Sequence, residues 1–338
     1  MIKAVPDADL GLKTYDPELL FHLAGEQERQ KKKSSAEKLY LKLLKEFPTS
    51  RFVEAARYNL GLLLEDKKLF RRASEEYEEI LQGYKGLGSD ELPQIWVDTR
   101  LRLGVCYYKL GAFGASATSF SILAEQTWVD LEERVEAYMG LGIALQKTDR
   151  EEETEAALTR ALSLARRLMR RGQRDERRFG AEAAFRLGLI SAKRFRDTSL
   201  EFPMALLRKR LEEKCRFLLE AQSRYLRAVR MGDVQTISAA GLNIGKLYEG
   251  LYREIIQLQP PQNLTEFEVE VYNEEVKRKV LVLLRKAIKV YEKAARVSRR
   301  LARKNPWLKK LEQSLTTIRK LYLKAEDELA AADAMMDG

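Results

Sequence analysis

The sequence contains few of the residues on which most catalytic and metal sites depend. Its 338 residues include one histidine, His22, and two cysteines, Cys106 and Cys215. The cysteines do not form a CxxC pair, and neither the GxxxxGK[ST] nor the GxGxxG phosphate-binding pattern is present. We therefore expect no metal, no cofactor and no small-molecule substrate, and the sequence favours a protein that is not an enzyme.

Proline and long apolar runs are also scarce. The 8 prolines include several near expected helix ends, and no apolar run approaches the roughly 20 residues that span a bilayer. With 45% hydrophobic and 33% charged residues, the chain is expected to be all-α and without a transmembrane segment. Its first residues lack the apolar core of a signal peptide. The expected compartment is periplasmic if a signal peptide was removed and cytoplasmic otherwise.

A spacing pattern recurs along the first half of the chain. Counted from Pro17 as position 1, a small residue at position 8 is followed by a second small residue at position 20 and a large one at position 24. The four copies are Ala24, Ala36 and Tyr40; Gly61, Ala73 and Tyr77; Gly104, Ser116 and Phe120; and Gly142, Thr154 and Leu158. A generic helical bundle has no reason to repeat at a fixed period.

This pattern resembles the tetratricopeptide repeat (TPR) family, whose unit is a helix-turn-helix of 34 residues. The resemblance implies a TPR-type superhelix of helical hairpins, an α-solenoid. We expect an N-terminal arm over residues 1–16 and four repeats over residues 17–170. Position 8 is expected to be small because the first helix of each hairpin approaches the small residue at position 20. The arginines between 166 and 178 are interpreted as a basic turn.

The second half, residues 171–338, repeats the pattern with longer spacing. The fifth unit has Gly188, and its second-helix residues Ala221 and Tyr225 come 21 residues later than the template predicts. The sixth has Gly245, with Ala287 and Tyr291 coming 30 residues late. We expect long helical hairpins on the same frame, closed by a terminal helix after Pro306. The alternative is a separate helical domain.

The resemblance also implies a binding groove, because TPR arrays line their concave face with positions 2, 5, 9, 12 and 13 of the first helices. We expect an apolar groove that suits an amphipathic helix or a hydrophobic peptide. The lysine and asparagine of the family's carboxylate-binding members are absent from positions 5 and 9 of repeats two to four. The alternative is that residues 1–16 fill the groove. The candidate groove residues are Phe21, Tyr58, Leu62, Leu101, Val105, Tyr108, Met139 and Ile143.

Charge is divided unevenly between the halves. Residues 1–170 carry 26 lysines and arginines against 28 acids, a net −2, whereas residues 171–338 carry 35 against 23, a net +12. We favour an acidic protein surface as the partner of this basic half. Nucleic acid is the less favoured partner, because acids such as Glu212, Glu213, Glu274 and Glu275 are interleaved with the basic residues and no RNA-binding aromatic motif is present. Anionic lipid headgroups or envelope polymers are a third reading.

Residues 240–325 carry a second resemblance. The segments Leu247–Tyr252, Pro260–Thr265, Tyr272–Glu275 and Lys286–Lys293 are similar to the C-terminal region of TPR proteins of the myxobacterial gliding-motility machinery. That resemblance implies an envelope-associated scaffold within a multiprotein complex. A cytoplasmic TPR adaptor is the alternative.

Overall fold

Helices form the whole regular structure of the described part of the chain. The computed structural model describes residues 16–172, 177–231, 234–262, 264–301 and 306–336, and these ranges contain no strand. The expected arm therefore lies almost wholly outside the described residues. Contacts divide the chain into two units, residues 1–133 and 134–338. The protein is all-α and is built from TPR-type helical hairpins in both units.

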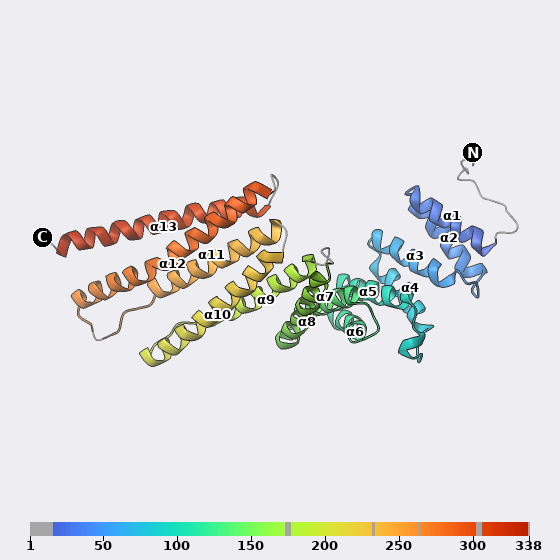
Figure 1. Cartoon of the computed structure of the whole chain (residues 1–338), viewed down its shortest axis with the longest axis horizontal. Helices are drawn as coiled ribbons and strands as arrows, with labels where there is room; N and C mark the ends of the chain where they lie inside the picture. The colour runs from blue at the N-terminus through green and yellow to red at the C-terminus, as the bar shows by residue number, and fades with distance from the viewer. Residues whose placement is uncertain (1–15, 173–176, 232–233, 263, 302–305, 337–338) are drawn as a thin grey trace. The chain divides into compact units, whose positions relative to one another are not determined.

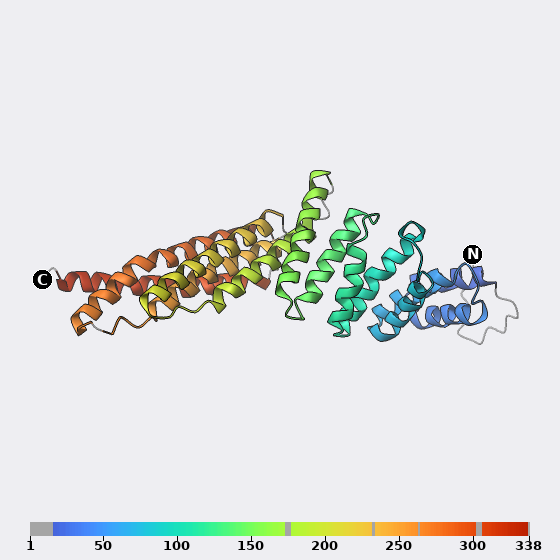
Figure 2. The ribbon, with the colours of Figure 1, turned by 90° about the horizontal axis from the view of Figure 1, so that it is seen from below.

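The first unit consists of three short hairpins. Each hairpin pairs consecutive helices, and α2 contacts α3 as α4 contacts α5, so neighbouring hairpins stack (Figure 2). Asp16 caps the first helix by accepting a hydrogen bond from the Glu18 backbone N–H, and Pro17 follows at the first helical position. The helices are α1 (Pro17–Arg29), α2 (Lys33–Glu46), α3 (Val53–Asp66), α4 (Phe70–Gln82), the short 3-10 helix η1 (Ser89–Glu91), α5 (Gln94–Lys109) and α6 (Phe113–Ala124).

The second unit contains the longer helices (Figure 1). Helix α8 packs on α9, α9 pairs with α10, α11 pairs with α12, and α13 packs on both α11 and α12. Its helices are α7 (Leu131–Leu145), which begins just before the unit boundary, α8 (Glu151–Arg170), α9 (Arg177–Asp197), α10 (Met204–Met231), α11 (Val234–Ile256), α12 (Glu266–Leu301) and α13 (Pro306–Met336).

The turns of the first four repeats share one backbone feature. Position 15 has a positive φ in every copy: 60° at Lys31, 62° at Lys68, 78° at Gly111 and 55° at Asp149. This left-handed conformation is one that glycine adopts without strain and other residues adopt less readily. The same left-handed position therefore lies in the turn that follows the first helix of all four hairpins, in phase with the side-chain pattern.

A close approach at position 8 holds each hairpin together. A Cβ placed on Gly61 would lie 2.4 Å from the ring of Tyr77, and one on Gly104 would lie 2.7 Å from the ring of Phe120. The nearest atoms therefore belong to position 24, whereas the repeat pattern predicts a close approach to position 20. Position 20 is nevertheless close in the third repeat, where the Ser116 hydroxyl donates a 2.8 Å hydrogen bond to the Gly104 carbonyl.

The long hairpins keep the same contact. A Cβ on Gly188 would lie 2.6 Å from the Tyr225 ring, and one on Gly245 would lie 2.2 Å from the Tyr291 ring. Tyr225 and Tyr291 are fully buried. The extra residues therefore lengthen the hairpins on the side of the connecting turn and leave the helix crossing as it is in the short repeats.

A buried lysine joins three helices of the second unit. Lys214, on α10, is 1% exposed, and its Nζ donates to the carbonyl oxygens of Phe195 at 2.8 Å and Thr198 at 2.6 Å. The same ammonium lies 2.7 Å from a carboxylate oxygen of Glu254 on α11. The ammonium satisfies the Phe195 carbonyl near the end of α9 and the Thr198 carbonyl just beyond it, and the Glu254 carboxylate compensates the buried charge.

We predict opposite effects of Gly→Ala substitutions at two helical glycines. Gly61→Ala places a methyl group 2.4 Å from the Tyr77 ring and should lower the free energy of unfolding by about 1–3 kcal/mol. Outside its chain neighbours and its own helix backbone, Gly25 has no described atom within 4 Å of its Cβ position. Gly25→Ala should therefore raise that free energy by about 0.5–1 kcal/mol. Denaturant unfolding of both variants measures the difference, and equal effects would contradict the close approach.

Candidate partner-binding site

The structure divides the predicted groove residues between the two units. Phe21 lies on α1, Tyr58 and Leu62 on α3, and the next three candidates on α5, all within the first unit. Met139 and Ile143 lie on α7 within the second unit. The first unit thus supplies a set of six, which are Phe21, Tyr58, Leu62, Leu101, Val105 and Tyr108.

Burial separates accessible candidates from core residues. Leu101 is 8% exposed and Met139 is 3% exposed, and Met139 packs in a core cluster with Leu158 and Leu187. Both occupy position 5, one turn before the close approach at position 8. These two side chains therefore belong to the core and cannot line an open groove. The remaining candidates are half-buried: Phe21, Tyr58, Leu62, Val105, Tyr108 and Ile143.

The half-buried aromatic rings rest on other rings. Tyr58 lies 5.9 Å from Tyr77, centroid to centroid, and Tyr108 meets Phe113 edge-on at 5.3 Å. Such pairs fix ring orientation and leave one face or edge available to a partner. Burial, and secondarily the charge of Asp98, raises the pKa of Tyr58, so its hydroxyl stays a neutral hydrogen-bonding group.

A buried carboxylate fixes the helices that carry these rings. The Glu65 side chain on α3 is 8% exposed and accepts two hydrogen bonds from the Arg102 guanidinium on α5, at 2.8 and 2.7 Å. The Tyr77 hydroxyl on α4 donates to the same carboxylate at 2.7 Å. Burial and then Glu65 raise the pKa of Tyr77. This network sets the spacing between Tyr58 and Leu62 on α3 and the residues of α5.

The tyrosine–glutamate pair recurs at the same repeat positions. The Tyr40 hydroxyl donates to Glu28 at 2.8 Å, and the Tyr291 hydroxyl donates to Glu249 at 3.2 Å. Each glutamate stands at position 12, four residues after position 8. In the fifth unit that position is Ala192, and the buried Tyr225 hydroxyl has no hydrogen-bond partner among the described residues. The sequence contains a signal for this hydrogen bond, which is a glutamate one helical turn after the small residue at position 8.

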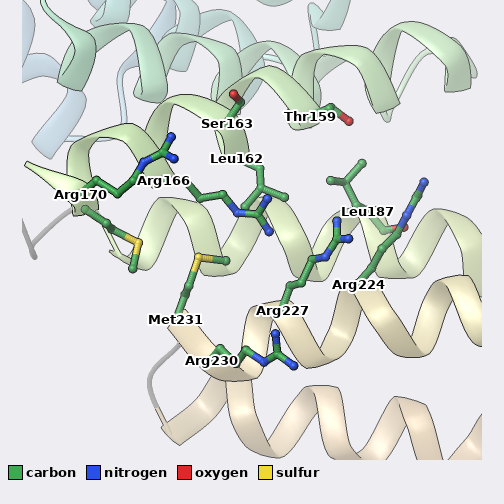
Figure 3. A pocket seen from close by; sticks show the side chains of 11 residues that line it. Thr159, Leu162, Ser163, Arg166, Arg170, Leu187, Arg224, Arg227, Arg230 and Met231 are labelled. Carbon is green, nitrogen blue, oxygen red and sulfur yellow. The ribbon is translucent and has the colours of Figure 1, made fainter.

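The second unit contains a hollow between α8 and α10, with α9 beneath it (Figure 3). Its volume is about 910 Å³, and arginines from two helices gather around it. We call it the arginine groove; its lining residues are Thr159, Leu162, Ser163, Arg166, Met169, Arg170, Leu187, Arg224, Arg227, Arg230 and Met231.

Four of the five arginines have no acidic partner in the part of the chain that the structure describes. Arg224 pairs with Glu155 and with Glu220 at 2.5 Å, and it donates to the Leu187 carbonyl at 3.0 Å. Within the described residues, the others make no ion pair; they are Arg166, Arg170, Arg227 and Arg230. Burial, followed by the charges of Arg227 and Arg170, lowers the pKa of Arg166. The groove therefore holds four arginines that no described acidic side chain neutralises.

The sequence pattern does not predict this groove. The run of basic residues suggests a turn at Arg166 and Arg170, whereas both lie in the last turns of α8. The partner row on α10 was not recognised, because it lies more than fifty residues away. The sequence signal that could have found the groove is helical spacing, which places arginines on one face of each helix. Arg166 and Arg170 are four residues apart, and Arg224, Arg227 and Arg230 follow one another at intervals of three.

The candidate catalytic groups have ordinary surroundings. Burial, followed by the nearby Glu65 charge, raises the pKa of the Cys106 thiol to about 12, far from that of a reactive thiolate. His22 is exposed and lies 3.8 Å from Glu18. Across the described ranges, no cluster of three or more histidine, cysteine or acidic side chains could hold a metal ion. In those same ranges no helix is both long and apolar enough to cross a membrane.

Comparison with known proteins gives structural neighbours only. No family model and no curated protein sequence matches the chain. The solved structure of MamA is 17% identical, covering 73% of this chain and 96% of its own, with a TM-score of 0.44. Pseudomonas aeruginosa PilF is 14% identical over 78% of this chain and 90% of its own, with a TM-score of 0.42. YrrB, described as a TPR protein with an unusual peptide-binding site, is 16% identical over 64% of this chain and 91% of its own, with a TM-score of 0.40.

We predict that two Tyr→Phe substitutions separate the roles of the buried hydroxyls. Tyr77→Phe removes a hydrogen bond to the Glu65 carboxylate and should lower the free energy of unfolding by about 1.5–3 kcal/mol. Tyr225→Phe removes a hydroxyl that has no hydrogen-bond partner in the described ranges, so stability should be unchanged or higher by up to about 1 kcal/mol. Urea unfolding checks both values. A loss at Tyr225→Phe as large as that at Tyr77→Phe would contradict this assignment.

Proposed function

We propose that this protein is a non-enzymatic TPR scaffold that binds partner proteins through the first helices of its first unit. The observation that carries the proposal is the half-buried apolar set on α3 and α5, namely Tyr58, Leu62, Val105 and Tyr108. The Glu65–Arg102 pair holds those two helices at a fixed spacing. An apolar strip of this kind suits an amphipathic helix or a hydrophobic peptide.

The non-enzymatic part of the proposal is supported by the state of the candidate nucleophile and base. A buried thiol with a raised pKa is a poor nucleophile, and the exposed His22 faces a glutamate without a serine or cysteine partner. Aromatic side chains that are partly accessible on a rigid frame are more typical of binding surfaces.

We further propose that the scaffold works in a cell-envelope complex of the gliding-motility type, in the periplasm after removal of a signal peptide. This assignment rests on the resemblance of residues 240–325. A cytoplasmic TPR adaptor is the second candidate. Cell fractionation of the product of the native gene distinguishes them: recovery in the envelope fraction supports the first, and recovery in the cytoplasm contradicts it.

We predict that a Tyr58→Ala/Tyr108→Ala variant stays folded and loses partner binding. Aromatic anchors dominate such interfaces, so recovery of specific partners from an extract of the native host should fall at least about tenfold. The measurement is affinity capture compared with the wild type, with circular dichroism as the folding check.

A matched control replaces two exposed apolar residues of the first unit outside the strip, Leu87→Ala and Trp128→Ala. This control should recover the same partners as the wild type. Removal of residues 1–15 tests whether the arm fills the groove. If the arm fills it, partner binding should rise when these residues are removed. A folded Tyr58/Tyr108 variant that keeps every partner would contradict the proposed groove.

A further inference from the structure

The arginine groove is organised as two rows of like charge. Arg166 and Arg170 are one turn apart on α8, and Arg227 and Arg230 are one turn apart on α10. All four are exposed and unpaired within the described residues. Like charges held close together repel one another, and a bound anion relieves this repulsion. The guanidinium fork suits carboxylates in particular, because two parallel N–H groups meet two oxygens.

The groove also has an apolar lining. Leu162, Met169, Leu187 and Met231 contribute to it between the arginine rows. Methionine adapts its shape to an inserted side chain more readily than branched residues do. A fitting occupant therefore carries several carboxylates and at least one apolar side chain on the same short segment.

The beginning of α12 has these properties. Glu266, Glu270 and Glu274 recur every four residues and so lie along one stripe of the helix. None of them makes an ion pair with a described residue, whereas Glu275 lies 3.5 Å from Lys279. Phe267 stands beside this stripe and is 72% exposed, the highest value among the exposed large hydrophobic residues. No residue of α12 before Leu281 is fully buried.

One copy of the chain cannot bring these two surfaces together. Met231 ends α10 only a few residues before Val234 begins α11, so the groove and the start of α11 share one end of the unit (Figure 1). Helix α11 then runs for 23 residues, about 35 Å at 1.5 Å per residue, before the chain turns into α12. The first turns of α12, which carry the acidic stripe, are at the opposite end of the unit, as the course of the ribbon in Figure 2 also shows.

We propose that the acidic first turns of α12 in one copy dock into the arginine groove of a second copy, giving head-to-tail self-association. Glutamates four residues apart are about 6 Å apart along the helix, which is the spacing of Arg166 and Arg170 on α8. Phe267 supplies the apolar side chain that Met169 and Met231 accommodate. Because the two contacting surfaces differ, the interface is heterologous and extends to a chain or closes to a ring.

Sedimentation velocity of the full chain over a concentration series tests this interface. At about 50 mM salt the wild type should associate as concentration rises, and at about 300 mM salt the association should weaken, because exposed charges are screened. Arg166→Glu/Arg227→Glu and Glu266→Arg/Glu270→Arg should each weaken self-association at least about tenfold. An equimolar mixture of the two variants should associate again, because the unaltered groove of one variant meets the unaltered stripe of the other and the two reversed surfaces are also complementary.

The matched control is Arg208→Glu/Lys209→Glu, which makes the same charge change at exposed residues of α10 outside the groove and should associate like the wild type. A wild type that stays monomeric throughout, or a mixture that fails to associate, overturns the proposal. Groove-dependent binding of duplex DNA or anionic vesicles without self-association also overturns it, in favour of another occupant. Tyr58→Ala/Tyr108→Ala should leave self-association intact, so this test and that of the proposed partner groove can fail separately.

Discussion

The contact between a small residue at position 8 and a large side chain at position 24 is the constraint on which the hairpins depend. Tyr77 and Phe120 lie where a Cβ on Gly61 or Gly104 would otherwise be. Each large side chain is buried by this approach, which brings the two helices of a hairpin together. A carboxylate at position 12 then satisfies the hydroxyl wherever the large residue is a tyrosine and a glutamate is present.

The same constraint explains how the second unit departs from regular repeats. Hairpins gain about 20 to 30 residues at the turn side because nothing at the crossing depends on helix length. The longer helices need additional ties, and the Lys214 ammonium provides one between α9, α10 and α11. The lengthened α12 also extends past the part that packs on its neighbours, which exposes Phe267 and the acidic stripe.

Sequence periodicity predicted the hairpins because a small residue at position 8 and a large residue at position 24 recur in each repeat. It did not predict that Tyr77, and not Ala73, comes nearest to Gly61, since residue sizes at both positions fit a close approach. The positive φ at Lys31, Lys68 and Asp149 was also hidden, because only Gly111 carries the residue that favours it. Burial removed Leu101 from the candidate groove.

The arginine groove was hidden for a different reason: its two rows come from helices far apart in the sequence. The two candidate surfaces therefore differ in how they arise. The apolar strip of α3 and α5 follows from repeat positions, whereas the groove follows from the spacing that α9 imposes between α8 and α10. A scaffold with an apolar groove and a separate basic groove can hold a partner and associate with itself at the same time.

A double-mutant cycle at Gly245 and Tyr291, in the longest hairpin, tests the central claim most directly. Gly245→Ala alone should destabilise the protein, and in a Tyr291→Leu background the same substitution should have much less effect, giving a coupling free energy of about 1–3 kcal/mol. Additive effects of the two substitutions on the free energy of unfolding would contradict the account, because they would show that the close approach does not govern the elongated hairpins.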